Sequence, residues 1–280
     1  MARIRVVTDS ACDLPAEVAA EQGITVVPLS IRFGSEEFVD GKDLSTAEFW
    51  ARCKASSVLP ETAAPSPGAF QEAFLSAADD GCDGVLCIDL SGALSATYQS
   101  AVAAAKAVSD RIEVRVVDSR SVTMGLGLMV LDTAELAAGG ADLDTLEARA
   151  TQLVPHGAVF GVVDNLEHLT KGGRIGGAQA LLGSMLSIKP VVALVDGVVE
   201  QESKQRTRAR SLQYLADKMR QSPPLARVAV AHGDAADIDT FLALVADVPS
   251  EHPIVVGQLG PVIGTHTGPG TVGLCMITAP

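Results

Sequence analysis

Residues 265–273 combine hydroxyl side chains, an imidazole and glycines within a part of the chain that is otherwise apolar. The glycines match the pattern G-x-G-x-x-G, but a dinucleotide site also needs a following helix and an acidic residue about 20 positions further on. Only seven residues follow Gly273, so the pattern does not predict a Rossmann site. Thr265, His266 and Thr267, with the glycine N–H groups, are suited to a carboxylate or phosphate oxygen. We interpret the segment as a ligand-binding loop; a tight turn with a structural histidine is the alternative.

Four further polar segments stand at predicted strand-to-helix junctions or in loops, where α/β proteins place ligands. Helix N-termini expose unpaired N–H groups, so hydroxyls there can share an anionic headgroup with the backbone. One such segment alone is more often a helix cap, but four of them favour a binding site. The segments are residues 8–10, 61–66, 91–98 and 118–121, and their candidate ligand-binding residues are Thr62, Ser91, Gly92 and Ser95.

Residues for catalysis or metal binding are not predicted. No serine has a glycine two positions before it, so the G-x-S-x-G nucleophile elbow is absent. The five histidines lack H-x-x-x-H and H-E-x-x-H spacing, and the five cysteines form no C-x-x-C pair. Asp9, Ser95 and His266 can be drawn as a triad, which keeps an acyl hydrolase or transferase as an alternative. We otherwise expect a binding protein with no catalytic residue and no metal.

Composition limits the partners of the chain. A formal net charge of −13 argues against unaided binding to nucleic acid or anionic membranes. No segment approaches the roughly 18 apolar residues of a membrane span, and the start lacks the apolar stretch of a signal peptide. We therefore expect a cytoplasmic protein without stable membrane insertion. Hydrophobic residues make up 48% of the chain but aromatic ones only 4%, so any cavity should have an aliphatic lining suited to an alkyl chain.

A basic stretch stands out against the acidic background. Seven of the 21 lysines and arginines lie within residues 171–210. Gly172 and Gly173 precede Arg174, an arrangement that exposes backbone and presents a guanidinium fork suited to phosphate or carboxylate. Gly172 also fits the end of a helix that begins near Asn165. We predict that Arg174, Lys171 and Arg206 face a protein partner, whereas a solvated helix surface is the alternative for each.

These residues must be positioned by an α/β framework, and 280 residues favour two domains. We expect a first domain at residues 1–155 that alternates strands and helices around a parallel sheet. Ser45 with Glu48 forms a capping box, and Ser66 before Pro67 signals another helix start. The predicted strands are residues 4–7, 24–31, 84–90 and 112–117, and the predicted helices are 15–22, 46–53, 67–78, 95–108, 123–138 and 144–153.

The second predicted domain, residues 156–280, has a mixed α+β pattern. Asp196-Gly197 between two apolar runs signals a hairpin with a type I′ turn, which a purely parallel sheet would not use. The hairpin strands are predicted at 191–195 and 198–200. Further strands are predicted at 228–231, 253–256 and 272–277, and helices at 208–220 and 236–246.

Short motifs stand in one order over essentially the whole chain. They are V-T-D-S at 7–10, T-A-A-P-S at 62–66, L-S-A-T-Y-Q-S-A at 94–101, V-D-S at 117–119, L-T-K-G-G-R-I at 169–175, I-K-P at 188–190, K-Q-R-T at 204–207 and H-T-G-P-G at 266–270. In this order they resemble the DegV family of bacterial fatty-acid-binding proteins. The resemblance implies a two-lobed DegV-like α/β fold with the ligand between an N-terminal parallel α/β domain and a C-terminal mixed α+β domain.

The resemblance also implies a function. It implies one long-chain fatty acid, such as palmitate or oleate, with its carboxylate held by Thr62, Ser95 and His266. Family members serve as the lipid-carrying subunit of fatty acid kinase, whose separate catalytic subunit phosphorylates the carboxylate with ATP for phospholipid metabolism. No cofactor other than the bound fatty acid is implied. A lipid-dependent regulatory protein is a further alternative.

The chain departs from the family pattern at four positions. The family commonly has Ser-Gln where this chain has Ala63-Ala64, serine at Gly92 and glycine at Ala96. These changes remove hydroxyls and an amide near the expected headgroup but retain Thr62 and Ser95.

Overall fold

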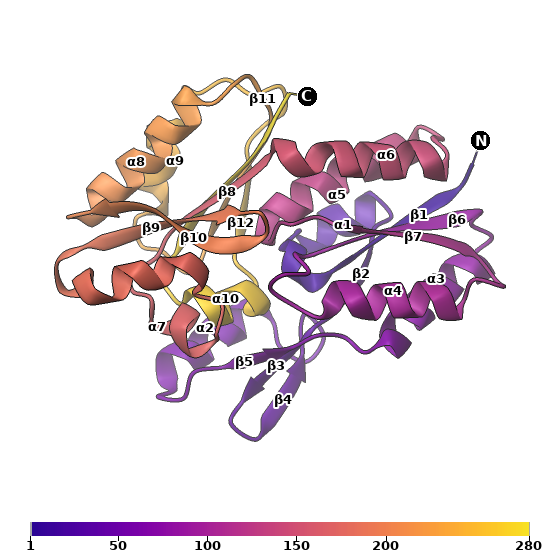
Figure 1. Cartoon of the computed structure of the whole chain (residues 1–280), viewed down its shortest axis with the longest axis horizontal. Helices are drawn as coiled ribbons and strands as arrows, with labels where there is room; N and C mark the ends of the chain where they lie inside the picture. Colours follow the sequence, from indigo (N-terminus) through magenta and orange to yellow (C-terminus); the bar gives the residue numbers. More distant parts are fainter. Residues whose placement is uncertain (1, 280) are drawn as a thin grey trace.

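Two large sheets of different construction form the centres of the two lobes of the molecule, and a small third sheet accompanies the first (Figure 1). The computed structural model describes residues 2–279, apart from the side chains of residues 183–187. The predicted domain ranges also include Met1 and Pro280, which lie outside the described residues. Within residues 2–279, no helix is both long and apolar enough to cross a membrane.

The first lobe contains a four-stranded parallel sheet in the order β2-β1-β6-β7. Its strands are β1 (Ile4–Asp9), β2 (Thr25–Val27), β6 (Gly84–Asp89) and β7 (Glu113–Asp118). The central strands are rich in Val, Ile and Leu because helices cover both of their faces. Phe70 and Phe74 of α3 (Pro67–Asp79) pack on one face beside α4 (Thr97–Ala107). The other face packs against α5 (Thr123–Ala138) and α6 (Leu143–Leu153).

The predicted strand 24–31 is wrong as a single element. The chain leaves the parallel sheet after β2 and begins a second, antiparallel sheet at β3 (Ser30–Phe33). Pro28 lies at this break, and a proline cannot donate the N–H that a continuous strand would need. The second sheet has the order β4-β3-β5, with β4 at Glu36–Val39 and β5 at Glu61–Ala63. The sequence therefore predicted the parallel sheet but missed the small sheet below it in Figure 1.

Helix starts in the first lobe follow their capping residues. Ser45 and Glu48 form the predicted capping box at the start of α2 (Thr46–Ala55), and the Ser66 side chain caps α3. A short helix, α1 (Ala16–Glu21), precedes them. By contrast, α4 begins at Thr97 instead of the predicted Ser95, because Ser91 to Ser95 form a turn of their own with Ser95 N donating to Ser91 O at 3.2 Å.

The second lobe contains a six-stranded mixed sheet in the order β10-β9-β8-β13-β11-β12. Its strands are β8 (Gly157–Val162), β9 (Lys189–Val195), β10 (Val198–Gln205), β11 (Leu225–His232), β12 (Val255–Gln258) and β13 (Val272–Thr278). Positive φ angles of 49° at Asp196 and 81° at Gly197 agree with the predicted type I′ hairpin between β9 and β10. The outer face is covered by α8 (Arg208–Gln221) and α9 (Ile238–Val245), at the upper left of Figure 1.

Short helices line the region between the lobes. They are η1 (Ser10–Cys12), η2 (Val154–His156), α7 (Glu167–Lys171), η3 (Gly176–Ser187) and α10 (Pro261–Thr267). The predicted end of a helix at Gly172 is confirmed, since Gly172 follows the last residue of α7. The predicted loop 265–273 is wrong in its first part, because His266 stands in the last turn of α10. Pro261 starts that helix and Gly268, with φ 76°, ends it, so the helix is too short for periodicity to reveal.

The apolar core is continuous between the lobes. Leu126 and Leu128 of α5 share one buried cluster with Ala229, Ala231 and Cys275 of the six-stranded sheet. The predicted boundary at residue 155 falls within η2, between the strands of the two lobes. A division of the chain into two domains stays a prediction, since residues on both sides of this boundary build one core.

Candidate functional site

A pocket lies where α10 and α7 of the second lobe meet β5 and the segment before α4 of the first lobe. We call it the central pocket. It is bounded mostly by aliphatic side chains and by a few polar ones that come from both halves of the chain. Its lining residues are Leu29, Thr62, Leu90, Leu94, Ser95, Val122, Leu169, Arg174, Val199, Val262, Ile263, His266 and Thr267.

Thr62 and His266 meet across the interface between the lobes. Thr62 is the middle residue of β5, and its register partner Ile31 on β3 fixes its height in the small sheet. His266 projects from the last turn of α10, and its Nε2 lies 2.9 Å from the Thr62 hydroxyl oxygen. When Nε2 carries the proton and donates to that oxygen, the threonine hydroxyl is free to donate its own hydrogen to a ligand.

The imidazole of His266 is tightly enclosed. A Cβ placed on Gly172 would lie 2.4 Å from its Nδ1, so only glycine leaves room for the ring there. Nδ1 is buried without a hydrogen-bond partner among the residues that the structure describes. Burial, followed by the charges of Arg174 and His168, lowers the pKa of His266 to about 4. The ring is therefore neutral at pH 7 in the ligand-free protein.

Ser95 supplies a second hydroxyl to the central pocket. Its Oγ lies 2.8 Å from the Thr97 hydroxyl, and the Thr97 backbone N–H donates to it at 3.3 Å. If Thr97 donates through its hydroxyl as well, the hydrogen of Ser95 is free for a ligand. Ser95 stands just before α4, whose N-cap Ala96 makes no side-chain capping hydrogen bond, so the Ser95 hydroxyl oxygen accepts from the first N–H of the helix in its place.

Arg174 brings a positive charge to the same pocket. Its Nε donates to the carbonyl of Leu94 at 3.1 Å, and its Nη1 donates to the carbonyl of Gly172 at 2.7 Å. The guanidinium thus links the second lobe to the turn that carries Ser95. The sequence assigned Arg174 to a partner-facing surface, whereas the structure places it in the lining of the central pocket beside His266.

A polar mouth adjoins the central pocket on one side. It shares Thr62, Arg174 and His266 with the central pocket. Its other lining residues come from the segment before β5, from α7 and from α10. They are Ser57, Val58, Leu59, Pro60, Glu61, His168, Lys171, Gly172 and Thr265.

An apolar pocket adjoins the central pocket on the other side. The two share Val122, Leu169, Val199, Ile263 and Thr267. The apolar pocket extends over the inner face of the six-stranded sheet, where its further lining residues are Thr123, Val159, Phe160, Gly161, Val163, Val192, Ala193, Leu194, Leu259, Thr271 and Gly273. The central and apolar pockets have cavity volumes of about 80 Å³ and 70 Å³, below the range of about 300–1,000 Å³ usual for ligand pockets, so a bound ligand would require the lining side chains to move apart. Mouth, central pocket and apolar pocket form one passage, polar at one end and apolar at the other.

Two of the other candidate ligand-binding residues are used in structural contacts. The buried Ser91 hydroxyl donates to the carbonyl of Gly197 at 2.7 Å and so joins the first lobe to the β9–β10 hairpin. Gly92 donates its N–H to Asp118 at 3.1 Å, and a Cβ there would lie 2.9 Å from the same carboxylate. Among the described residues that line the passage, neither Ser91 nor Gly92 occurs.

The two threonines beside His266 have their hydroxyls engaged within α10. Thr265 donates to Pro261 O at 2.8 Å, and Thr267 donates to Ile263 O at 3.0 Å. Thr265 lines only the mouth, whereas Thr267 lines the central and apolar pockets. Their methyl groups and oxygens shape the passage, but their hydroxyl hydrogens are already donated to the helix backbone.

The remaining partner candidates lie outside the central pocket, although Lys171 lines the mouth. Lys171 is exposed and forms an ion pair with Glu167 at 2.8 Å, four residues earlier on α7. Arg206 is exposed at the end of β10. The positions that depart from the family pattern, Ala63, Ala64, Gly92 and Ala96, are likewise absent from the described lining of the passage.

In two of the four polar segments, residues 8–10 and 118–121, the acidic side chain accepts hydrogen bonds from backbone N–H groups and does not line the described passage. The buried Asp9 carboxylate accepts from the N–H groups of Ala11 and Leu90, both at 2.8 Å, and burial raises its pKa to about 7. Asp118 accepts from Gly92 N and from Arg120 N, the latter at 2.9 Å. Carboxylates that accept from nearby backbone N–H groups are turn and helix-cap residues. A helix cap was the alternative interpretation of each polar segment taken alone.

Sequence reasoning missed His168. Its imidazole lies in the wall of the mouth, with Nδ1 2.9 Å from the carbonyl of Thr265, so it supports the turn of α10 that carries His266. The signal that could have found it is its place on the short helix before the Gly172-Gly173 pair, directly ahead of the L-T-K-G-G-R motif.

Comparisons with known proteins agree with this architecture. A family model described as "Uncharacterised protein, DegV family" matches residues 3–279. A DegV domain-containing protein of Streptomyces coelicolor is 36% identical over 277 residues, covering 97% of this chain and 97% of that protein.

Two solved structures share the fold. A DegV family protein from Thermus thermophilus, described as fatty acid binding, superposes with a TM-score of 0.90 at 34% identity, covering 99% of this chain and 100% of that chain. A stearic-acid-binding protein from Eubacterium ventriosum superposes with a TM-score of 0.86 at 27% identity, covering 99% of this chain and 98% of that chain. These matches confirm the two-lobed α/β fold that the motifs implied. The chain belongs to the DegV family.

Proposed function

We propose that this protein binds one long-chain fatty acid, with the alkyl tail in the apolar pocket and the carboxylate in the central pocket. The observation that carries the proposal is the graded passage: hydroxyl, imidazole and guanidinium groups at one end, aliphatic side chains at the other. The fatty-acid-binding relatives from Thermus thermophilus and Eubacterium ventriosum support it. No cofactor besides the lipid is part of the proposal.

Thr62, Ser95 and Arg174 are proposed to hold the carboxylate, with His266 completing the site. A neutral His266 donates through one nitrogen, and a bound anion nearby would raise its pKa from the ligand-free value. The hydroxyls of Thr62 and Ser95 approach from the first lobe, and Arg174 and His266 approach from the second. The carboxylate would thus be bound by both lobes at once.

The tail dominates the expected affinity and the headgroup sets the orientation. Burial contributes about 0.8 kcal/mol per methylene, so a 16-carbon chain offers on the order of 11 kcal/mol before the costs of ordering. Charge-assisted hydrogen bonds to the carboxylate add about 1.5–3 kcal/mol each, offset by desolvation. Palmitate and oleate therefore suit the passage better than short acids, which lack the apolar area.

We propose binding without catalysis by this chain. A hydrolytic triad of Asp9, Ser95 and His266 would need the acid to orient the imidazole through Nδ1. Asp9 instead accepts from two backbone N–H groups, and Nδ1 of His266 lacks a partner among the described side chains. The imidazole contacts Thr62, and the Ser95 hydroxyl contacts Thr97. This arrangement favours a carrier over the hydrolase or transferase alternative.

We further propose that the bound acid is presented to the catalytic subunit of a fatty acid kinase, which phosphorylates the carboxylate with ATP. The polar mouth adjoins Thr62, Arg174 and His266, so a carboxylate held there would be within reach from the surface. Lys171 on the rim and Arg206, which directly follows β10, are exposed cations suited to docking an acidic partner surface. The cytoplasm, where ATP is present, is the expected compartment.

Native mass spectrometry of the purified protein, followed by calorimetry with palmitate after delipidation, tests the binding proposal. We expect a co-purifying fatty acid and a clear preference for palmitate over 1-hexadecanol, which has the same chain length but no carboxylate. Arg174→Glu should lose that preference because it reverses the charge beside the headgroup. A delipidated protein that binds neither compound would refute the proposed function.

Kinase presentation is tested separately by reconstitution with a fatty acid kinase catalytic subunit and ATP. Acyl phosphate should form only when the carrier is present. Lys171→Glu with Arg206→Glu should lower acyl phosphate formation without changing palmitate affinity, and Lys106→Glu on the distant helix α4 serves as the matched control. Equal activity of the double variant and the control would contradict the docking assignment.

A further inference from the structure

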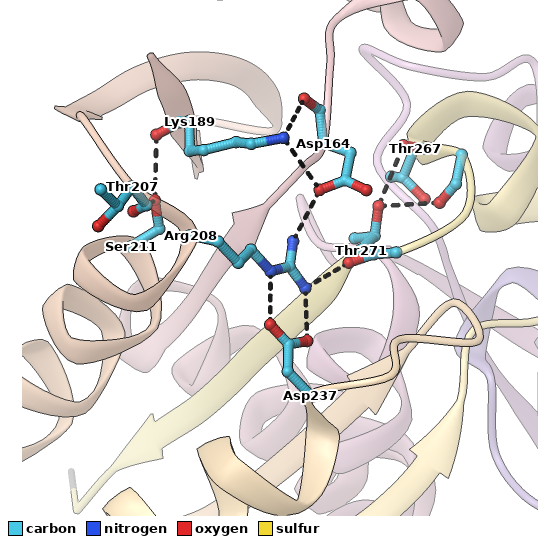
Figure 2. Close-up of polar contacts among 10 residues, drawn as sticks. Asp164, Lys189, Thr207, Arg208, Ser211, Asp237, Thr267 and Thr271 are labelled. Carbon is cyan, nitrogen blue, oxygen red and sulfur yellow. Dashed lines mark hydrogen bonds and ion pairs between the residues drawn. The ribbon is translucent and has the colours of Figure 1, made fainter. Parts of the chain in front are cut away.

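Arg208 occupies an unfavourable place for a cation, and its contacts explain why. It is the first residue of α8, where the partial positive charge of the helix N-terminus disfavours a guanidinium. The side chain is only 20% exposed. Nε and Nη2 donate to the two oxygens of Asp237 at 2.9 and 3.0 Å, and Nη1 lies 3.3 Å from an oxygen of Asp164 (Figure 2). Two carboxylates thus compensate the charge and hold the guanidinium plane in one orientation.

The same guanidinium also binds the backbone beyond α10. Nη2 donates to the carbonyl of Gly270 at 2.5 Å, in the turn between α10 and β13. Arg208 therefore joins four segments that are distant in sequence: the start of α8, the residue before α9, the residues after β8 and the turn after α10. Lys189 reinforces the centre of this network through a 3.5 Å contact with Asp164, as Figure 2 shows.

The turn held by Arg208 is closely confined on its other sides. Gly268 and Gly270 have φ angles of 76° and 80°, which favour glycine. A Cβ on Gly268 would lie 2.6 Å from the His168 ring, and one on Gly270 would lie 2.5 Å from the Asp164 carboxylate. Thr271 donates to Gly268 O at 2.9 Å and also to the carbonyl of the last residue of α10, closing the helix end.

His266 lies two residues before this turn, so the turn determines where its imidazole stands. The contact between His266 Nε2 and the Thr62 hydroxyl spans 2.9 Å and joins residues 204 positions apart. A small displacement at the end of α10 would open it. Arg208, Asp164 and Asp237 are absent from the described lining of the passage, so they can act on the headgroup only through the turn.

We propose that Arg208 is a positioning residue for headgroup recognition, which fixes the end of α10 so that His266 meets Thr62. The inference rests on the proposed function. It predicts that loss of Arg208 weakens recognition of the carboxylate without weakening binding of the alkyl tail. A structural role alone would lower stability and would affect both parts of the ligand equally.

The experiment compares palmitate with 1-hexadecanol on delipidated wild-type protein and on Arg208→Gln. The ratio of the two affinities isolates the headgroup because the tails are identical. We expect the ratio to fall about tenfold in Arg208→Gln, as if one charge-assisted hydrogen bond were lost, while hexadecanol affinity is unchanged. Arg208→Lys keeps the charge but lacks the fork that reaches Asp237 and Gly270 together, so it should not restore the ratio.

Arg149→Gln is the matched control. Arg149 is similarly placed, 25% exposed, with Nε and Nη2 donating to both oxygens of Asp132 at 2.7 and 3.1 Å, but it lies on α6, away from the passage. Its loss should lower the melting temperature and leave the ratio at the wild-type value. If Arg208→Gln fails to fold, the same affinity ratio is measured on Arg208→Lys and Asp237→Asn.

Two results would overturn the inference, and they differ in whether carboxylate recognition by the protein is also rejected. A wild-type preference for palmitate that survives in the Arg208 variants, or that lysine fully restores, rejects the positioning role but leaves the proposed function standing. A wild-type protein that binds palmitate no more tightly than hexadecanol rejects carboxylate recognition and, with it, the role of Arg208.

Discussion

His266 should make the lipid-free protein lose stability as the pH falls, because the folded protein resists protonating it. Its pKa is lowered from 6.5 to about 4, first by burial and then by the charges of Arg174 and His168. Between these pH values the unfolded chain binds a proton at His266 that the folded protein does not bind. The stability that depends on the neutral ring is complete above about pH 6.5, declines toward pH 4 and stays constant below it.

The size of this loss follows from the two pKa values. The full interval corresponds to about 3 kcal/mol of unfolding free energy, of which about 2 kcal/mol is lost by pH 5. His266→Gln removes the titrating group, so its unfolding free energy should fall about 2 kcal/mol less than that of the wild type between about pH 7.5 and 5. In melting temperature this is about 4–8 °C for a chain of this size.

Urea unfolding of delipidated protein measures the difference. Trp50, the single tryptophan, is 4% exposed and its Nε1 donates to Leu259 O just before α10, so its fluorescence reports the fold near the site. Groups other than His266 titrate alike in wild type and variant, so they cancel in the comparison. His252→Gln, at an exposed histidine, is the control. Parallel stability curves for wild type and His266→Gln would refute the burial argument.

Three further variants test other parts of the structure. Thr62→Val combined with Ser95→Ala should weaken palmitate binding by about 2–4 kcal/mol through the loss of two charge-assisted hydrogen bonds, and an unchanged calorimetric affinity would remove both residues from the site. Gly161→Val should shift binding from palmitate toward laurate, because a Cβ there meets no neighbour closer than 3.4 Å and projects into the apolar pocket. Gly157→Val, on the same strand but outside that pocket, is its control, and an equal shift in both variants would contradict the reasoning. Asp89→Asn should remove a loss of stability that the wild type undergoes as the pH rises above the ordinary carboxyl pKa of 3.8, because burial holds the pKa of Asp89 in the folded protein well above that value. The melting temperature of the variant should therefore decline less than that of the wild type between about pH 4 and 7, and an equal decline in both proteins would count against a buried, protonated Asp89.

Long elements of the fold could be predicted from the sequence because many residues contribute to their hydrophobic periodicity. The predicted helix 123–138 matches α5 at both ends, and the Asp196-Gly197 signal located the hairpin. The small sheet and α10 were missed because strands of three or four residues and a helix of seven carry too few positions for a period to appear. Pro28 was the available signal that the strand 24–31 must break.

The candidate site was predictable only in part, for a physical reason. Thr62, Ser95 and His266 came from separate segments, and the structure brings all three into one pocket. Ser91 has the same chemistry as Ser95 but donates to Gly197, 106 residues away, and such a distant partner leaves no local trace in the sequence. Arg174 was predicted to face a partner because a charged side chain next to glycines suggests a surface turn. Its hydrogen-bond acceptor, the Leu94 carbonyl, is 80 residues away in the sequence and could not be inferred from neighbouring residues.

The position of β13 has a consequence for how the protein forms during its synthesis. β13 lies between β8 and β11, although more than a hundred residues separate it from β8 in the chain. A nascent chain that has not yet produced β13 carries two unpaired strand edges, and α5 of the first lobe lacks part of the surface on which it packs. Gly273, which pairs with Gly161 in the wall of the apolar pocket, is also missing at that stage. The pocket proposed for the lipid is therefore completed only when β13 has joined the sheet.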